Sequence, residues 1–151
     1  MATYLITGSS RGLGLALVKQ LIDSPHAQVS KIFATARSNA SAPLQDLVHK
    51  HPNRVVFVQL DTTSKPSISN AVAQVEEHLD GQGLDVLVNN AGIQTICPAG
   101  VQAVDDLNET FNANVTSVQM VTSAFLPLLS KGTQKKVINM QVILISGTSL
   151  G

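Results

Sequence analysis

The fold is decided by the stretch Thr7-Gly8-Ser9-Ser10-Arg11-Gly12-Leu13-Gly14. The apolar, strand-like run 2–6 precedes it, and residues 13–21 alternate apolar and polar positions as a helix does. A strand, a glycine-rich turn and a helix in this order form a phosphate site, because the N–H groups of the turn and the positive end of the helix dipole point at an incoming anion. We therefore predict a phosphate-binding turn here, with a glycine turn that binds nothing as the alternative.

The three glycines have separate expected roles. Gly8 permits the tight turn, Gly12 lets a pyrophosphate approach the backbone, and Gly14 lets the helix pack closely on the strand. The spacing Gly-x-x-x-Gly-x-Gly differs from the Gly-x-Gly-x-x-Gly of most dinucleotide dehydrogenases, and the Gly-Lys-Ser/Thr ending of a P-loop is absent. It is the Thr-Gly-x-x-x-Gly-x-Gly form of the short-chain dehydrogenase/reductase family, which the chain resembles. The resemblance implies that Ser10 and Leu13 also line a cofactor site.

Composition limits the class of protein. The 151 residues are 44% apolar, which suffices for one ordinary core, and ten basic and ten acidic residues leave no net charge. This balance gives no reason to expect nucleic acid as a partner. The single cysteine, Cys97, excludes an internal disulfide and fits a reducing compartment. The sequence shows no signal-peptide pattern and no apolar run long enough to cross a bilayer, so we expect a cytoplasmic protein without a membrane partner.

Strand-like and helix-like patterns alternate along the whole chain. Strands are expected at 2–6, 28–36, 55–60, 84–88 and 136–145, and helices after the glycine turn and at 41–49, 65–79 and 104–129. In the last helix, the spacing of apolar residues from Val104 to Leu129 predicts one continuous buried face. This alternation predicts an α/β protein with a doubly wound parallel sheet, a three-layer α/β/α Rossmann fold. We predict one nucleotide-binding domain over residues 1–151, incomplete at its C-terminal end.

Residues at the ends of the strands are candidates for ligand binding, because ligands of such sheets bind beyond the carboxyl ends of the strands. Arg37 ends the second strand, where an NAD enzyme usually has an acid that holds the ribose 2′-hydroxyl. An arginine there can pair with a 2′-phosphate, and Arg11 in the glycine turn can reach the same group. The two arginines predict NADP(H) rather than NAD(H); a solvated surface charge is the alternative for each.

Further matches to the family follow the third and fourth strands. The resemblance implies that Asp61, followed by Thr62, hydrogen-bonds the adenine amino group, although Asp61 is equally suited to cap the next helix. Asn89-Asn90-Ala91-Gly92 matches the family motif at all four positions, where small residues admit the cofactor ribose and the first asparagine ties neighbouring strands. Asn114 matches the family asparagine that binds a water in the proton relay. An exposed mid-helix asparagine is the alternative for Asn114.

The chain is similar to carbonyl-reductase-like members of the family. The resemblance therefore implies hydride transfer between NADPH and a small carbonyl or alcohol substrate. The chain departs from the family at the catalytic acid/base, which in the family is the tyrosine of a Tyr-x-x-x-Lys motif. That motif is not present, and Tyr4, the only tyrosine, stands in the first strand. Val142 stands where the family has a catalytic serine; an insertion of residues 141–146 would place Thr148 there instead. We expect a truncated and catalytically incomplete chain.

Two other expectations concern the chain as a whole. The alternative function is a non-catalytic NADP(H)-binding or interaction protein of the same fold, and a fragment that is not expressed is a third possibility. The apolar run 142–145 would lie at a sheet edge, so we expect poor solubility or self-association, including a homo-oligomer. A monodisperse monomer in solution would contradict that expectation.

Overall fold

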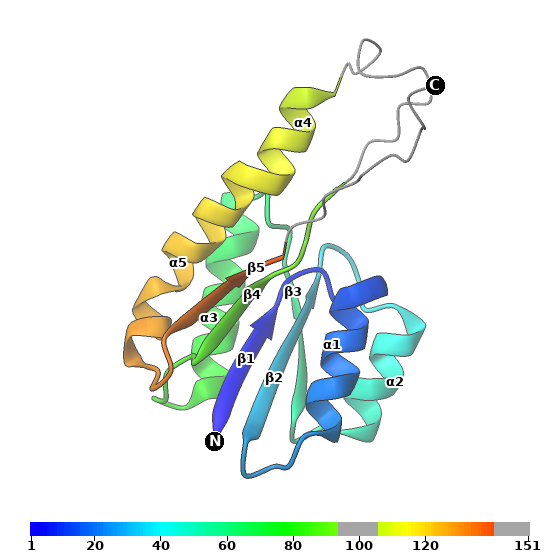
Figure 1. The fold of residues 1–151 in the computed structure, drawn as a ribbon, viewed down its shortest axis with the longest axis vertical. Helices are drawn as coiled ribbons and strands as arrows, with labels where there is room; N and C mark the ends of the chain where they lie inside the picture. The colour runs from blue at the N-terminus through cyan, green and yellow to red at the C-terminus, as the bar shows by residue number, and fades with distance from the viewer. Residues whose placement is uncertain (94–105, 141–151) are drawn as a thin grey trace, which may run out of the picture.

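A parallel sheet of five strands in the order β3-β2-β1-β4-β5 forms the middle layer of the protein (Figure 1). The computed structural model describes residues 1–93 and 106–140. The strands are β1 (Ala2–Ile6), β2 (Val29–Ala36), β3 (Val55–Gln59), β4 (Val86–Asn89) and β5 (Lys136–Asn139). The helices are α1 (Gly12–Asp23), α2 (Ala42–Lys50), α3 (Lys65–Leu79), α4 (Leu107–Phe111) and α5 (Ser117–Lys131).

Helices cover both faces of the sheet. On one face, α1 and α2 bury Val18 and Leu44 against sheet residues that include Ile6 and Ile32. On the other face, α3 and α5 pack against Leu5, Phe33 and Leu87 of the sheet. The buried side chains of these two helices are Ile68, Ala71, Val75, Leu79, Val121, Phe125, Leu128 and Leu129. The predicted doubly wound, three-layer fold is confirmed.

The strand order reverses at β1, which pairs with β2 on one side and with β4 on the other. In sheets of this kind the crevice at such a reversal, at the carboxyl ends of the strands, is where ligands bind. The glycine turn leaves β1 at this end of the sheet, between β1 and α1. The topology therefore brings the turn next to the ends of β2 and β4.

Most predicted boundaries are within one or two residues of the observed ones. The helix predicted at 65–79 is α3, and Ser64 caps it by accepting a hydrogen bond from the backbone N–H of Ser67 at 3.4 Å. The strand predicted at 84–88 is instead Val86–Asn89. The N–H of Leu84 binds the carbonyl of Leu128 at 3.0 Å and the N–H of Asp85 binds the Thr3 hydroxyl, so neither donates within the sheet. Residues 141–145 of the predicted fifth strand lie outside the described residues.

The prediction for the helix at 104–129 is wrong in one respect. The observed helix runs from Leu107 to Lys131 with a π-helical segment, Asn112–Thr116, between α4 and α5. Phe111 and Val115, expected in the core, are 60% and 50% exposed. Hydrogen bonds in the π-helical segment span five residues instead of four, which rotates α4 relative to α5 and changes the face that points inward. The buried face instead follows the positions Ala113, Ser117, Val121, Phe125 and Leu128.

A buried carboxylate ties three strands together at the end of the sheet away from the glycine turn. Asp85 is only 5% exposed, and its side chain accepts hydrogen bonds from the backbone N–H groups of Thr3 (2.9 Å), Thr133 (2.7 Å) and Gln134 (3.1 Å). The hydroxyl of Thr133 donates a further bond at 2.7 Å. Burial raises the pKa of Asp85, but these hydrogen bonds outweigh it and lower the pKa to about 2.

Strand β5 lies at an edge of the sheet. All four of its residues are exposed, and within the described part of the chain it pairs only with β4. Val137 and Ile138 of this strand are 40% and 42% exposed, whereas the run 142–145, predicted to lie at this edge, is outside the described residues. Self-association through this edge stays a prediction. No helix in the ranges 1–93 and 106–140 has the length and apolar character needed to cross a membrane.

Candidate functional site

A cavity of about 670 Å³ opens at the carboxyl ends of the strands, where the strand order reverses. It brings together segments from the glycine turn, the ends of β2 and β3, the residues after β4, and the start of the long helix. All predicted cofactor-binding residues except Gly14 and Asn89 line it, namely Gly8, Ser10, Arg11, Gly12, Leu13, Arg37, Asp61, Thr62, Asn90, Ala91 and Gly92.

The glycine turn has the backbone that its sequence predicts. Gly8 and Gly12 have φ angles of +69° and +57°, which other residues rarely adopt. A Cβ on Gly8 would lie 2.9 Å from the Cα of Ala91, so the turn and the residues after β4 are in close contact. A Cβ on Gly12 would meet no atom of the described residues within 4 Å, and Gly12 lines the cavity. Space therefore remains for a ligand to approach the backbone at Gly12.

Thr7 holds the turn to the end of β4. Its side chain is 1% exposed, and its hydroxyl oxygen accepts hydrogen bonds from the backbone N–H groups of Asn90 and Ala91, both at 2.9 Å. The side-chain amide of Asn90 donates in return to the carbonyls of Thr7 (2.9 Å) and Gly8 (3.1 Å). These four bonds fix the two segments of the cavity wall relative to each other.

Replacing Thr7 by valine is expected to lower the free energy of unfolding by about 2 kcal/mol, because two N–H groups would lose their acceptor while the shape of the side chain is kept. Thr7→Ser is the matched control: it retains the hydroxyl and is expected to cost less than about 1 kcal/mol. Urea unfolding of both variants measures the difference. Equal stability of the two variants would contradict a bonding role for the hydroxyl.

Gly14 and Asn89 lie behind the cavity wall and support it. A Cβ on Gly14 would lie 2.2 Å from the carbonyl oxygen of Gly8 and 2.6 Å from the amide nitrogen of Asn90. The side-chain amide of Asn89 donates to Asn139 Oδ1 (2.9 Å) on β5 and to Thr122 Oγ1 (3.1 Å) on α5. The expectation that Asn89 ties neighbouring strands is confirmed, and it joins α5 to them as well.

The two predicted arginines line the cavity from two separate segments. Arg11 belongs to the glycine turn and Arg37 follows β2, and both side chains are exposed. The ion pairs found within the described residues, Lys50–Asp46 and Lys131–Glu76, do not involve them. Both guanidinium groups are thus free of a carboxylate salt bridge in the described part of the chain, as a site for an anionic ligand requires.

Asp61 is committed to a local turn. Its Oδ1 accepts hydrogen bonds from the hydroxyl (2.7 Å) and the backbone N–H (2.9 Å) of Thr63. These bonds lower the pKa of Asp61, the charge of Arg37 adds to the effect, and burial opposes it. The alternative role of capping α3 is not observed, because Ser64 occupies that position. Asp61 remains ionised near neutral pH at the rim of the cavity.

Asn114 stands in the π-helical segment and binds the chain after β4. Its Oδ1 accepts from the N–H of Ile93 and its Nδ2 donates to the carbonyl of Ile93, both at 2.8 Å. A Cβ on Gly92 would lie 2.9 Å from Asn114 Oδ1, so a larger residue there would displace the Asn114 side chain from this position. The water-binding role implied for Asn114 stays a prediction. Thr148 lies outside the described residues.

The cavity also has lining residues that sequence reasoning missed. They are Ala36, Leu60, Thr63, Ile93, Glu109, Asn112 and Ala113. The first four directly adjoin predicted positions, so the strand-end rule could have included them. Glu109, Asn112 and Ala113 come from the helix whose inward face was predicted wrongly. Their spacing of three and four residues marks one helix face, and the structure places that face at the cavity.

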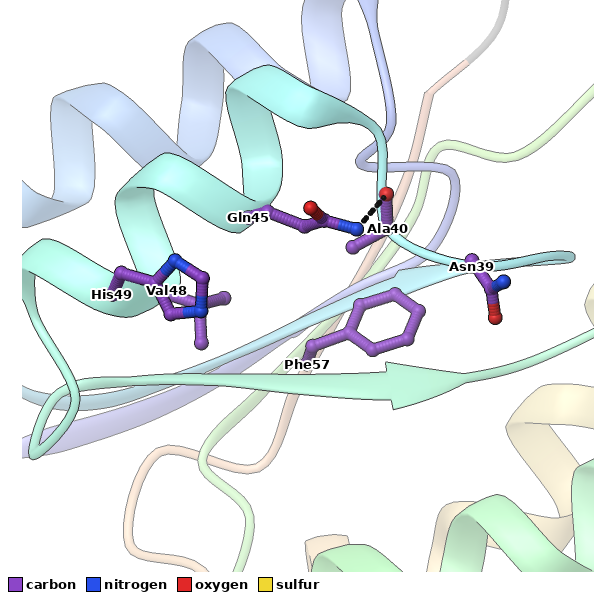
Figure 2. A pocket seen from close by; sticks show the side chains of 6 residues that line it. All are labelled: Asn39, Ala40, Gln45, Val48, His49 and Phe57. Carbon is purple, nitrogen blue, oxygen red and sulfur yellow. Dashed lines mark hydrogen bonds between the residues drawn. The ribbon is translucent and has the colours of Figure 1, made fainter.

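A second hollow, of about 420 Å³, lies between α2, β3 and the chain after β2. Figure 2 shows its lining, which consists of Asn39, Ala40, Gln45, Val48, His49 and Phe57. The side-chain amide of Gln45 is bonded to the carbonyl of Ala40 at 2.9 Å. Among the described residues, its lining contains no arginine, lysine or glycine turn, in contrast to the larger cavity.

Comparison with known proteins agrees with this geometry. The family model described as short chain dehydrogenase matches residues 2–146. A short-chain dehydrogenase/reductase of Aspergillus aculeatus, AacuF, is 38% identical over 95% of this chain, which spans 55% of that relative. The chain thus covers about half the length of this relative, and other related proteins are covered to a similar extent.

Two solved structures are similar to the fold described above. The carbonyl reductase Sniffer of Drosophila melanogaster is 36% identical with a TM-score of 0.85, over 100% of this chain and 66% of that one. A carbonyl reductase from chicken fatty liver, determined with NADPH bound, is 36% identical with a TM-score of 0.75, over 87% of this chain and 49% of that one. On the family match over residues 2–146, this chain belongs to the short-chain dehydrogenase family.

Proposed function

We propose that this chain provides the NADP(H) site of an oxidoreductase that transfers hydride between NADPH and a small carbonyl or alcohol substrate. The observation that carries the proposal is the cavity that Arg11 and Arg37 line together with the glycine turn. Its volume of about 670 Å³ lies within the range of ordinary ligand sites. The NADPH-bound carbonyl reductase among the similar structures supports the choice of cofactor.

The residues of the cavity fit the parts of a dinucleotide. The pyrophosphate would lie against the open side of Gly12, where the N–H groups of the turn and the N-terminus of α1 favour an anion. Arg37 and Arg11 would pair with the 2′-phosphate, and Asp61 with the adenine amino group. The residues after β4 would bear the ribose next to the nicotinamide. The bound cofactor would supply the hydride.

For the catalytic end, Asn114 is proposed to hold the wall after β4 in place through Ile93 and to bind the relay water. Tyr4 does not line the cavity, because it packs against the core cluster under α1 and α2. An acid/base from Tyr4 is therefore not part of the proposal. We further propose a reducing, cytoplasmic setting, which the single cysteine of the sequence supports.

Replacing Arg37 by alanine tests the proposal. We expect NADPH affinity to fall roughly 10- to 100-fold, because a charge-assisted, bidentate contact is lost, whereas NADH affinity should change less than about twofold. Titration followed by cofactor fluorescence gives both dissociation constants. Lys50→Ala, which removes an exposed cation outside the cavity, is the control and should change neither. Equal losses for NADPH and NADH, or no binding of either by the wild type, would contradict the proposal.

A further inference from the structure

A hydrogen bond joins the two segments that carry the arginines of the cavity. The hydroxyl of Ser41 donates to the backbone carbonyl of Ser10 at 2.6 Å, across 31 positions of sequence. Ser10 immediately precedes Arg11 in the glycine turn, and Ser41 ends the connection that begins at Arg37. Both serines are half-buried. The bond is therefore a direct link between the two arginine-bearing segments.

Ser41 makes this bond in place of the usual one. It occupies the position before the first residue of α2 with extended backbone angles (φ −61°, ψ 155°), where a serine normally caps its own helix. Its side chain makes no such cap bond. Ser64, in the same position before α3, does cap its helix. The hydroxyl of Ser41 is thus committed to the glycine turn and not to the helix that it precedes.

The rest of the turn is held by bonds to other elements. The Ser9 hydroxyl donates to the carbonyl of Ile6 (2.9 Å), and the Ser9 N–H donates to Thr35 on β2 (2.7 Å). The carbonyl of Gly8 accepts from Asn90 after β4. The bonds of Ser9 and Gly8 fix the turn to the strands and to the residues after β4. The Ser10–Ser41 bond, in contrast, fixes the turn to the segment after Arg37.

We propose that Ser41 is a positioning residue for cofactor selection, which sets the preference for NADPH over NADH by holding Arg11 and Arg37 on one 2′-phosphate. This inference rests on the proposed function. NADPH and NADH differ only in that phosphate, and under the proposed function both arginines would bind it through long, exposed side chains whose backbone must be held in place. A hydrogen bond between the two arginine-bearing segments therefore affects the recognition of NADPH more than that of NADH.

The test is to titrate NADPH and NADH into the purified wild-type protein and into S41A, S41T and S30A. In S41A the ratio of the NADH to the NADPH dissociation constant should fall about three- to tenfold, the effect expected for one hydrogen bond, through weaker NADPH binding. S41T keeps the hydroxyl and should restore the ratio. S30A is the matched control, because Ser30 also donates to a backbone carbonyl, that of Ala2 at 3.3 Å, but at the opposite end of the sheet.

The outcomes separate this inference from the proposed function. An unchanged ratio in S41A, or equal weakening of both cofactors, would overturn the positioning role while leaving the NADP(H) site in place. Wild-type protein that binds neither cofactor, or R37A protein that keeps the full preference, would overturn the proposed function itself. Circular dichroism checks that each variant is folded. Should S41A unfold, S41G replaces it, because glycine is tolerated before a helix with little loss of stability.

Discussion

Replacing Gly14 by alanine is expected to destabilise the protein by about 3 kcal/mol or more and to abolish NADPH binding. Gly14 lies in α1, where helix propensity alone would make alanine more stable by about 0.5–1 kcal/mol. The added Cβ would, however, lie 2.2 Å from the carbonyl oxygen of Gly8, which is backbone and cannot rotate away. The turn would have to open, and Asn90 would lose its place against it. Helix propensity predicts a more stable variant and the steric clash predicts a less stable one, so the sign of the change in unfolding free energy decides between them.

Urea unfolding and NADPH titration of Gly14→Ala measure both expectations. Gly81→Ala is the matched control, because Gly81 has φ +81°, no atom of the described residues would lie within 4 Å of an added Cβ, and Gly81 does not line the cavity. In that variant the free energy of unfolding should fall by only about 1 kcal/mol, the cost of alanine in the left-handed conformation, and the affinity for NADPH should be unchanged. A Gly14→Ala protein as stable as the wild type would contradict the packing described here.

Replacing Asp85 by asparagine is expected to lower the free energy of unfolding by about 3–5 kcal/mol at neutral pH. The carboxylate accepts bonds from donors in β1 and in the turn before β5, and an asparagine would present an N–H₂ group to some of these donors. Strands β1, β4 and β5 would lose their common tie at that end of the sheet. Asp46→Asn is the control: Asp46 is exposed and paired within α2, and its loss should cost less than about 0.5 kcal/mol.

The stabilisation by Asp85 should also depend on pH. The pKa of Asp85 is about 2 in the folded state, and that of an unfolded aspartate is about 3.9. The ionised carboxylate therefore stabilises the fold fully above about pH 4, and this contribution is lost as the pH falls through 2. The difference in unfolding free energy between wild type and Asp85→Asn should shrink by about 2 kcal/mol over that interval. A difference that does not change with pH would contradict the assignment.

Local patterns were sufficient to predict the sheet, the helices and most of the cavity. The glycine turn requires residues without a Cβ at Gly8 and Gly14, and the strand ends converge because the strands are parallel. The lining residues at the strand ends could therefore be predicted once the strands were placed, whereas Glu109, Asn112 and Ala113 of the helix could not. The positive φ of Gly12 and the close approach of Gly92 to Asn114 explain two further glycines of the motifs.

Contacts between distant segments were not predictable in this way. The outward rotation of Phe111 and Val115 follows from a π-helical segment that the apolar spacing does not reveal. The bonds of Asp85 and of Ser41 join residues far apart in sequence, and no periodicity marks them. An Asp before a strand or a Ser before a helix has several possible uses, and only the tertiary arrangement selects one.

The most direct test of the central claim, that the cavity at the carboxyl ends of the strands binds NADP(H), is amide chemical-shift mapping by NMR on the 15.9 kDa chain during addition of NADPH. We predict saturable shifts at the amides of Gly8, Gly12 and Arg37, which line the cavity, and little change at Gly81 and Thr133. Shifts confined to the hollow lined by Val48 and Phe57, or no shifts at saturating NADPH, would contradict the account.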